Sequence, residues 1–278
     1  MKNINRLNIL LSFTKTFHKF HIVDPSPWPL FGSIGSFMTT TGSVLWFHKF
    51  LGGTFLLYNG LLYVSYVMTV WWRDVIREAT FEKHHNFVVR RGLKLGFVLF
   101  LISEIMFFFG FFWAFFHASL NPVHNIGGVW PPIGIVTPNF LGTPLTISVF
   151  LITSGATLTG GHHFVKARAK RHGVIMLLWT LLLAFCFSFL QLYEYISLSF
   201  NISDGIYGSC FYMLTGLHGF HVFAGTIGIL VALIRLALNH FTNTQHLGLL
   251  TSVWYWHFVD VVWIFLYFSV YVWGSLKG

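Results

Sequence analysis

Long apolar runs separated by short polar segments make up most of the chain. Seven of these runs approach the roughly 20 residues that a helix needs to cross the hydrocarbon of a bilayer. The pattern therefore predicts an all-α membrane protein with seven transmembrane helices. The predicted spans cover residues 28–47, 51–72, 93–116, 143–164, 174–198, 207–238 and 249–274.

Composition supports a membrane protein and argues against a soluble one. Hydrophobic residues make up 55% of the chain and charged residues only 9%, and the mean hydropathy is +0.69. These values lie outside the range of soluble globular domains. Neither cysteine, Cys186 or Cys210, belongs to a disulfide framework or a thiolate cluster, since both lie in or next to predicted spans.

The distribution of positive charge predicts the topology. Seven crossings place the amino terminus and the second, fourth and sixth loops on one side of the membrane. All but two of the 17 Lys and Arg residues then fall on that side, and the exceptions are Lys49 and Lys277. Such an asymmetry marks the matrix or cytosolic side. We attribute the net charge of +9 to topology and anionic lipid rather than to nucleic-acid binding.

The segments between and before the spans divide into three kinds. Residues 1–27 are basic and lack the apolar core of a secretory signal, so we expect a retained surface segment. Residues 121–142 are uncharged and rich in proline, which predicts an irregular loop. Residues 73–92 are highly charged. Arg73 with Arg77, and Asp74 with Glu78, lie one turn apart, which predicts that the preceding helix continues into this connection as either a lipid-headgroup contact or a solvated face.

Small residues at helical spacing predict the faces on which spans pack. The sixth span carries one stripe, and shorter stripes occur in the third and first spans. Either contacts within the bundle or contacts with a neighbouring membrane subunit would use them. The stripes are His218, His221, Gly225, Gly228, Ala232 and Arg235; Ser103, Gly110, Ala114 and Ala118; and Gly32, Ser36 and Thr40.

Glu104 lies near the middle of the third span. Because removal from water disfavours a carboxylate, we expect this acid to be largely protonated unless a cation or a water chain reaches it. It is either a proton-handling group or a structural acid bonded to a neighbouring helix. Sequence spacing identifies no second carboxylate as its partner.

The histidines do not form a recognisable metal or haem site. His218 and His221 are three residues apart, as are His257 and Asp260, so two helices could present ligands. Bulky aromatic residues flank His257, however, and leave little room for a macrocycle. We therefore predict no metal ligands and no catalytic residues, and we expect His257 and Asp260 to bond each other or another helix.

Several long sequence runs resemble subunit III of the haem–copper cytochrome c oxidases. The resemblance extends over nearly the whole chain, apart from residues 1–20. The matching runs are residues 21–29 (HIVDPSPWP), 71–78 (WWRDVIRE), 103–117 (SEIMFFFGFFWAFFH), 204–209 (DGIYGS), 215–221 (TGLHGFH) and 254–263 (WYWHFVDVVW).

The resemblance implies a specific architecture and role. It implies a two-helix bundle (residues 28–72) and a five-helix bundle (residues 93–278), separated by a V-shaped cleft filled by phospholipid. It implies no haem or copper on this chain, contact mainly with subunit I, which with other subunits of the complex holds those groups, and support of proton uptake and oxygen entry. By position, it makes Trp72, Glu78, His85 and Arg235 candidate headgroup contacts and Glu104 the buried acid of the family.

On this resemblance we expect a non-redox subunit of a respiratory oxidase in the mitochondrial inner membrane, with its amino terminus in the matrix; the bacterial plasma membrane is the other location that stays open. The alternative is a free-standing proton or ion transporter that uses Glu104, His221 and Asp260. A second alternative is a haem protein with two histidine ligands.

Overall fold

A computed structural model describes residues 20–276, and every long element in this range is a helix. Most of the predicted amino-terminal surface segment lies outside the described residues, and residues 20–27 are exposed and lack helix or strand. The long helices are α2 (Trp28–Phe47), α3 (Gly53–Thr80), α4 (Phe87–Leu120), α5 (Thr143–Lys166), α6 (Lys170–Ser197), α7 (Gly205–Ala237) and α8 (Leu247–Leu266). They form two compact units, Met1–Leu93 and Lys94–Gly278, and the division falls within α4.

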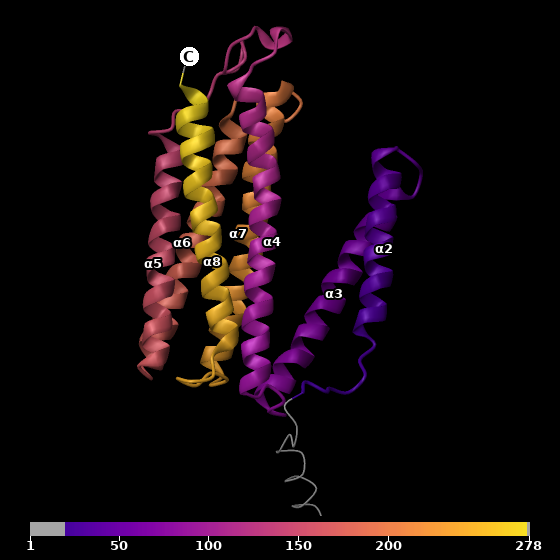
Figure 1. Ribbon diagram of the computed structural model, residues 1–278, viewed down its shortest axis with the longest axis vertical. Helices are drawn as coiled ribbons and strands as arrows, with labels where there is room; N and C mark the ends of the chain where they lie inside the picture. The colour runs from indigo at the N-terminus through magenta and orange to yellow at the C-terminus, as the bar shows by residue number, and fades with distance from the viewer. Residues whose placement is uncertain (1–19, 277–278) are drawn as a thin grey trace, which may run out of the picture. The chain divides into compact units, whose positions relative to one another are not determined.

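The first unit is a hairpin of α2 and α3 (Figure 1). Glycines bring the two backbones together: a Cβ on Gly42 would lie 2.5 Å from the Leu57 nitrogen, and one on Gly60 would lie 2.7 Å from the Thr39 nitrogen. Gly52, in the turn, has a φ of 84°, which favours glycine. Close backbone approach of this kind is how helices associate in lipid.

The predicted stripe on α2 is only partly its contact with α3, because Gly32 faces α3 but the rest of the stripe does not; contact of the exposed residues with a neighbouring subunit stays a prediction. Gly35 and Gly42 are buried against α3, whereas Ser36 and Thr40, from the predicted stripe, are exposed. Small residues surround this helix on several sides, so their spacing did not identify the face in contact.

Six helices are long and apolar enough to span a membrane, and α2 is not one of them. Serine and threonine lower its hydropathy, but many of their hydroxyls donate hydrogen bonds to carbonyl oxygens one turn earlier, as Ser36 does to Gly32 and Thr39 does to Gly35. Internal pairing of this kind reduces the cost of placing a hydroxyl in lipid. The seven predicted helices are thus all present in residues 20–276, and six of them are apolar enough to span a membrane.

The charged connection is shorter than residues 73–92, because α3 continues to Thr80 and α4 already begins at Phe87. The predicted helical extension is confirmed. It is fixed to the start of α2 by the Trp28 indole, which donates a 2.7 Å hydrogen bond to Asp74.

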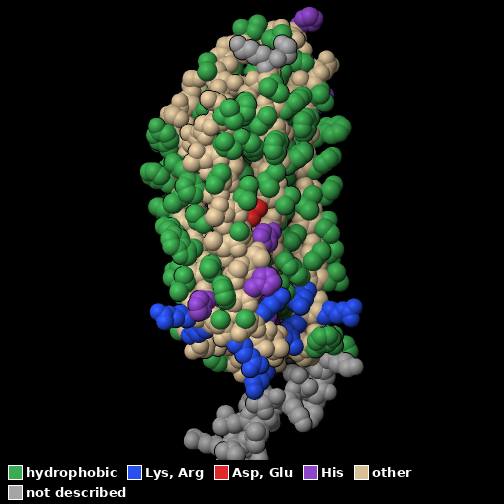
Figure 2. Space-filling model, turned by 90° about the vertical axis from the view of Figure 1, so that its left-hand side faces the viewer, with side chains coloured by type: hydrophobic (Ala, Val, Ile, Leu, Met, Phe, Trp, Pro, Cys, Tyr) green, Lys and Arg blue, Asp and Glu red, His purple; other side chains and the backbone are tan. Residues whose placement is uncertain are grey.

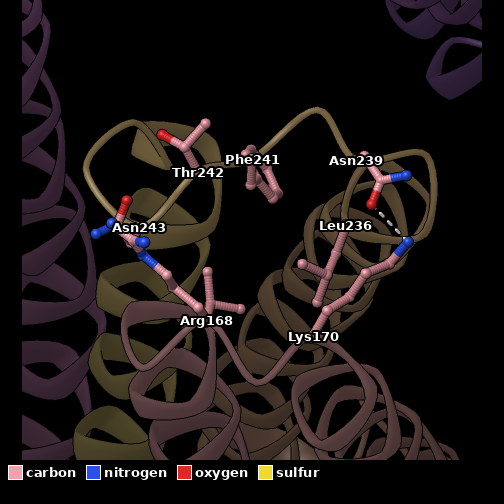
Figure 3. Close-up of a pocket in the computed structure, with 8 residues that line it drawn as sticks. Arg168, Lys170, Leu236, Asn239, Phe241, Thr242 and Asn243 are labelled. Carbon is pink, nitrogen blue, oxygen red and sulfur yellow. Dashed lines mark hydrogen bonds between the residues drawn. The ribbon is translucent and has the colours of Figure 1, made fainter.

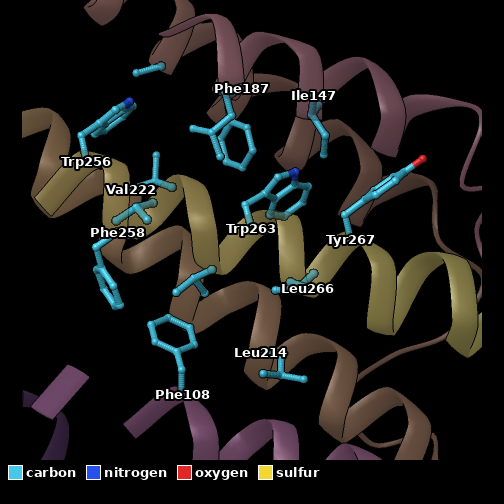
Figure 4. Packing of buried hydrophobic residues seen from close by; sticks show 14 of the residues in the cluster. Phe108, Ile147, Phe187, Leu214, Val222, Trp256, Phe258, Trp263, Leu266 and Tyr267 are labelled. Carbon is cyan, nitrogen blue, oxygen red and sulfur yellow. The ribbon is translucent and has the colours of Figure 1, made fainter. Parts of the chain in front are cut away.

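The second unit holds the main hydrophobic core. Figure 1 shows α5 to α8 and most of α4 running alongside one another. Buried aromatic and aliphatic side chains fill the space between these helices, with Trp263 stacked edge-on against Phe187 at 5.1 Å (Figure 4). The π-helical turn Tyr267–Val272 and the short helix Trp273–Ser275 continue α8 to the end of the described chain.

Helix α4 joins this core through large side chains rather than through its small residues. Phe108, Phe112 and Phe115 are buried at helical spacing, and the Phe112 ring lies 4.5 Å from that of Phe265 on α8. Ser103 and Gly110 are exposed, and a Cβ on Gly110 would meet nothing within 4 Å. The predicted small-residue face of α4 is therefore not its contact with the bundle.

The stripe on α7 is confirmed. Gly225 faces α8, where an added Cβ would lie 2.9 Å from the Trp256 ring, and Gly228 faces Ser252. His218, His221 and Ala232 on the same stripe are also buried.

The proline-rich loop before α5 is irregular as predicted, apart from the three-residue helix His124–Ile126. Its Trp130 is buried, 5.6 Å from Phe115 and 5.4 Å from Tyr207. The tryptophan thus closes one end of the five-helix core.

Lys and Arg side chains gather at one end of the face drawn in Figure 2, and hydrophobic side chains cover most of the rest. In the second unit, four cations lie at the junction of α5 and α6: Lys166, Arg168, Lys170 and Arg171. A basic end and an apolar middle are the surface expected of a membrane protein.

Candidate functional site

Glu104 occupies the middle of α4, on the face that Phe108 and Phe112 continue toward the core. Its side chain is 21% exposed, so it lies at the edge of the second unit rather than inside it. The hydrocarbon around this depth offers no hydrogen bonds, and a carboxyl group here needs a protein partner.

His221 is that partner. Its Nε2 lies 2.7 Å from Glu104 Oε2, and its Nδ1 lies 2.8 Å from the Leu217 carbonyl oxygen. A carbonyl oxygen can only accept, so Nδ1 carries a hydrogen and donates it. Nε2 then either accepts a hydrogen from protonated Glu104 or, as imidazolium, donates one to the carboxylate. In both cases the contact holds one proton between the two residues.

Aromatic rings surround this contact. The Phe108 ring centre lies 4.9 Å from that of His221, and Tyr255 stacks on the imidazole at 6.2 Å with 15° between the planes. The imidazole is only 6% exposed. Apolar surroundings strengthen the hydrogen bond between Glu104 and His221, and they raise the free-energy cost of leaving either side chain without a partner.

His218, one turn before His221, has a different environment. It is 1% exposed, its Nε2 lies 3.3 Å from the Val259 carbonyl oxygen, and its ring packs 4.9 Å from Trp263. It therefore joins α7 to α8 within the core and does not contact Glu104.

His257 and Asp260 bond each other and a neighbouring helix, as predicted. His257 Nδ1 lies 3.4 Å from Asp260 Oδ2, and His257 Nε2 lies 2.9 Å from the Thr159 hydroxyl of α5. Asp260 also contacts the α5 backbone at Gly155, where a Cβ would not fit. Two further bonds join these helices, from the Trp256 and Trp263 indoles to Ser154 and Ser148, each 2.9 Å long.

Sequence reasoning missed a second buried acid, Glu194. It is 3% exposed near the end of α6 and accepts long hydrogen bonds from the Gln191 amide at 3.4 Å and the Tyr271 hydroxyl at 3.3 Å. Gln191, one turn earlier on the same helix, was the available signal, because an amide and an acid at that spacing share a face.

The candidate headgroup residues do not form one cluster within either unit. Trp72, Glu78 and His85 belong to the first unit and Arg235 to the second. Trp72 is 58% exposed, as a headgroup contact requires. Arg235 instead turns toward protein, with its guanidinium 4.5 Å above the Phe241 ring.

A cavity of about 250 Å³ lies at the basic end of the second unit (Figure 3). Lys170 donates to the Ala237 carbonyl oxygen at 2.8 Å and to Asn239 at 2.7 Å, and it thereby caps the carboxyl end of α7. Arg168 lies on the other side of the cavity. The lining residues are Val165, Arg168, Lys170, Leu236, Asn239, Phe241, Thr242 and Asn243.

Comparisons with known proteins identify relatives over almost the whole chain. The family model described as cytochrome c oxidase subunit III matches residues 18–275. Proteins named cytochrome c oxidase subunit 3 are 54% identical in Prototheca wickerhamii and 50% identical in Arabidopsis thaliana, each over 93% of this chain and 98% of the relative. The rat protein of the same name is 49% identical over 94% of this chain and 100% of its own length.

Proposed function

Because the chain belongs to the cytochrome c oxidase subunit III family, we propose that it is a subunit of the respiratory oxidase that passes electrons from cytochrome c to oxygen. The observation that carries this proposal is the family match over residues 18–275. In this proposal the chain contributes structure and bound lipid, and the partner subunits hold the haem and copper.

The main partner in this proposal is subunit I, with contacts to other subunits of the complex. The membrane is the mitochondrial inner membrane, and the amino terminus faces the matrix. Six helices apolar enough to span a bilayer support a multi-pass protein. The concentration of Lys and Arg in the amino-terminal segment and the even-numbered loops supports the orientation.

The two central histidines are engaged in ways that disfavour haem ligation by this chain. Both ring nitrogens of His221 have partners, Leu217 and Glu104, and His218 Nε2 faces the Val259 carbonyl oxygen. Ligation of a haem iron by His221 would need one of its two ring nitrogens released. His218 Nδ1 has no hydrogen-bond partner among the described residues, but this side chain is 1% exposed and is enclosed by the helix core. These contacts support a structural role for the stripe on α7.

In this proposal the pair of Glu104 and His221 has a positioning role in the bundle and holds one proton near the middle of the membrane. The 2.7 Å contact supports both a structural tie between α4 and α7 and a proton exchange between acid and base. We favour the tie, because no second titratable group bonds either side chain in the described part of the chain.

Phospholipid is the ligand class that we propose for the exposed surfaces. The candidate headgroup contacts are Trp72, Glu78, His85 and Arg235, carried over from the family resemblance. Exposure of Trp72 and the charged extension of α3 support an interfacial position for the first three.

Purification from native membranes tests the function. An affinity tag on this chain should recover haem-bearing partner subunits and oxygen-reducing activity, while the chain isolated in detergent should show no Soret band. A free-standing transporter would instead purify alone and conduct protons or ions in liposomes, and that result would reject the proposal.

A further inference from the structure

His21, Glu78 and His85 form a three-residue cluster within the first unit. One ring nitrogen of each histidine and one carboxylate oxygen of Glu78 all lie within 4.8 Å of one another. His21 Nε2 and Glu78 Oε2 are 4.0 Å apart, and the two imidazole rings meet edge to face at 5.2 Å. In residues 20–276 this is the one group of three or more His, Cys, Asp or Glu side chains with metal-ligand spacing.

Three separate segments supply these side chains. His21 precedes α2, Glu78 lies in the last turn of α3, and His85 lies in the connection to α4. A simple ion pair needs only one histidine beside the carboxylate. A second imidazole brought to the same carboxylate from another segment gives three ligand atoms that can surround one metal ion.

From this geometry we propose that His21, Glu78 and His85 bind a divalent transition-metal ion of the zinc class. Two imidazoles and a carboxylate are a ligand set that zinc uses, with a fourth position left for water. Zinc–ligand bonds of about 2.0–2.2 Å place tetrahedral ligand atoms roughly 3.4 Å apart. The three atoms therefore need to close by at most about 1.4 Å from their present spacing.

Arg73, the nearby cation with an ion pair on α3, does not occupy the Glu78 carboxylate. Arg73 forms its 2.9 Å ion pair with Asp74, one turn earlier on α3, and not with Glu78. The side chains of His21 and Glu78 are 36% and 23% exposed, so an ion can reach them. A bound ion would fasten the segment before α2 to the end of α3, next to the bond from Trp28 to Asp74.

At Glu78 and His85 this metal site replaces the headgroup contacts proposed above, and it departs from the sequence-based prediction of no metal ligands. It does not depend on membership in an oxidase, because the ligands all belong to one unit of this chain. A zinc ion and the ammonium of a phospholipid headgroup would compete for the same carboxylate, so the test separates them.

The test measures zinc bound per copy of this chain in the purified native complex, after chelator treatment and dialysis against Zn²⁺. His21→Gln, Glu78→Gln and His85→Gln should each remove one equivalent of zinc. His84→Gln is the matched control, because His84 neighbours His85 but faces Glu82 at 3.4 Å, and it should keep the full amount. His21→Cys should also keep it, since a thiolate replaces the imidazole.

A second measurement needs no variant. Zinc should protect His21 and His85 of the unsubstituted chain, but not His84, from acylation by diethyl pyrocarbonate, read by peptide mass. Unchanged zinc content in all three cluster variants, or equal acylation of the three histidines with and without zinc, would overturn the proposal. Loss of copurifying aminophospholipid at constant zinc would also overturn it, in favour of the headgroup.

Discussion

At the scale of single residues, two histidines one turn apart have different roles. His218 is enclosed by core rings and bonds a backbone carbonyl, whereas His221 bonds an acid at the edge of the bundle. The difference arises from what faces each imidazole. Only His221 meets a group that can exchange a proton with it, so substitutions at the two positions should have distinct consequences.

Replacing Glu104 with Gln should preserve assembly of the complex. The glutamine amide can donate to His221 Nε2 while Nδ1 keeps its bond to Leu217, so the tie between α4 and α7 survives. Subunit content and haem content should match those of the unsubstituted complex. Intact assembly together with lost proton-coupled turnover would instead identify Glu104 as a proton relay.

Removing one partner at a time should cost more than removing both. His221→Ala leaves the Glu104 carboxyl unpaired in an apolar setting, at about 1–3 kcal/mol, and this loss should shrink when Glu104→Leu is added. The temperature at which heating releases this chain from the complex measures the effect in all four forms of the cycle. Additive losses would show that the 2.7 Å contact contributes no coupling.

The sequence allowed only part of this site to be predicted. Glu104 was identified by its depth within an apolar span, and His257 with Asp260 by their spacing. The pairing of Glu104 with His221 was missed, although each lies near the middle of its helix, because depth alone does not reveal which helices are neighbours. Glu194 was missed because an acid near a helix end usually faces water.

At the scale of helices, the chain uses two kinds of packing. The α2–α3 hairpin relies on glycines that bring backbones together, whereas α4 meets α8 through phenylalanine rings. The helical spacing of small residues identified stripes on these helices, but it did not show which stripe faces a neighbouring helix. The stripe identified the contact on α7, where one row stands out, but not the side of α2 that meets α3, because small residues occur all round that helix.

Substitution by alanine should be tolerated at Gly32 of α2 but not at Gly42. Gly42→Ala places a Cβ 2.5 Å from the Leu57 backbone nitrogen, which must move, at an overpacking cost of about 1–3 kcal/mol. Gly32→Ala is the control, because its Cβ would meet only ordinary contacts at 3.9 Å. Disulfide formation between cysteines placed at Ser43 and Leu56 should slow in the first variant only. Equal rates in both would contradict close packing at Gly42.

At the scale of the whole chain, helix number follows from the sequence more securely than membrane topology. Apolar length predicted all seven helices because each apolar side chain gains from leaving water, whatever its neighbours. Orientation depends on whether every helix crosses. The hydroxyl-rich α2 is less apolar than the six helices that are apolar enough to span a membrane. The side of the membrane on which the amino terminus lies therefore depends on whether α2 crosses.

Labelling of single cysteines should settle whether α2 crosses. If it does, Asp24→Cys shares a compartment with Asn243→Cys in the last loop, and Asn201→Cys, between α6 and α7, lies in the opposite one. In sealed vesicles, a membrane-impermeant thiol reagent should therefore react with positions 24 and 243 together and with position 201 separately, in a background where Cys186 and Cys210 are serine. We expect this result because hydrogen bonds from hydroxyl groups to carbonyl oxygens within α2, and glycine packing against α3, lower the free-energy cost of placing α2 in the membrane. Reaction of position 24 together with position 201 would place α2 on the membrane surface and reduce the crossings to six.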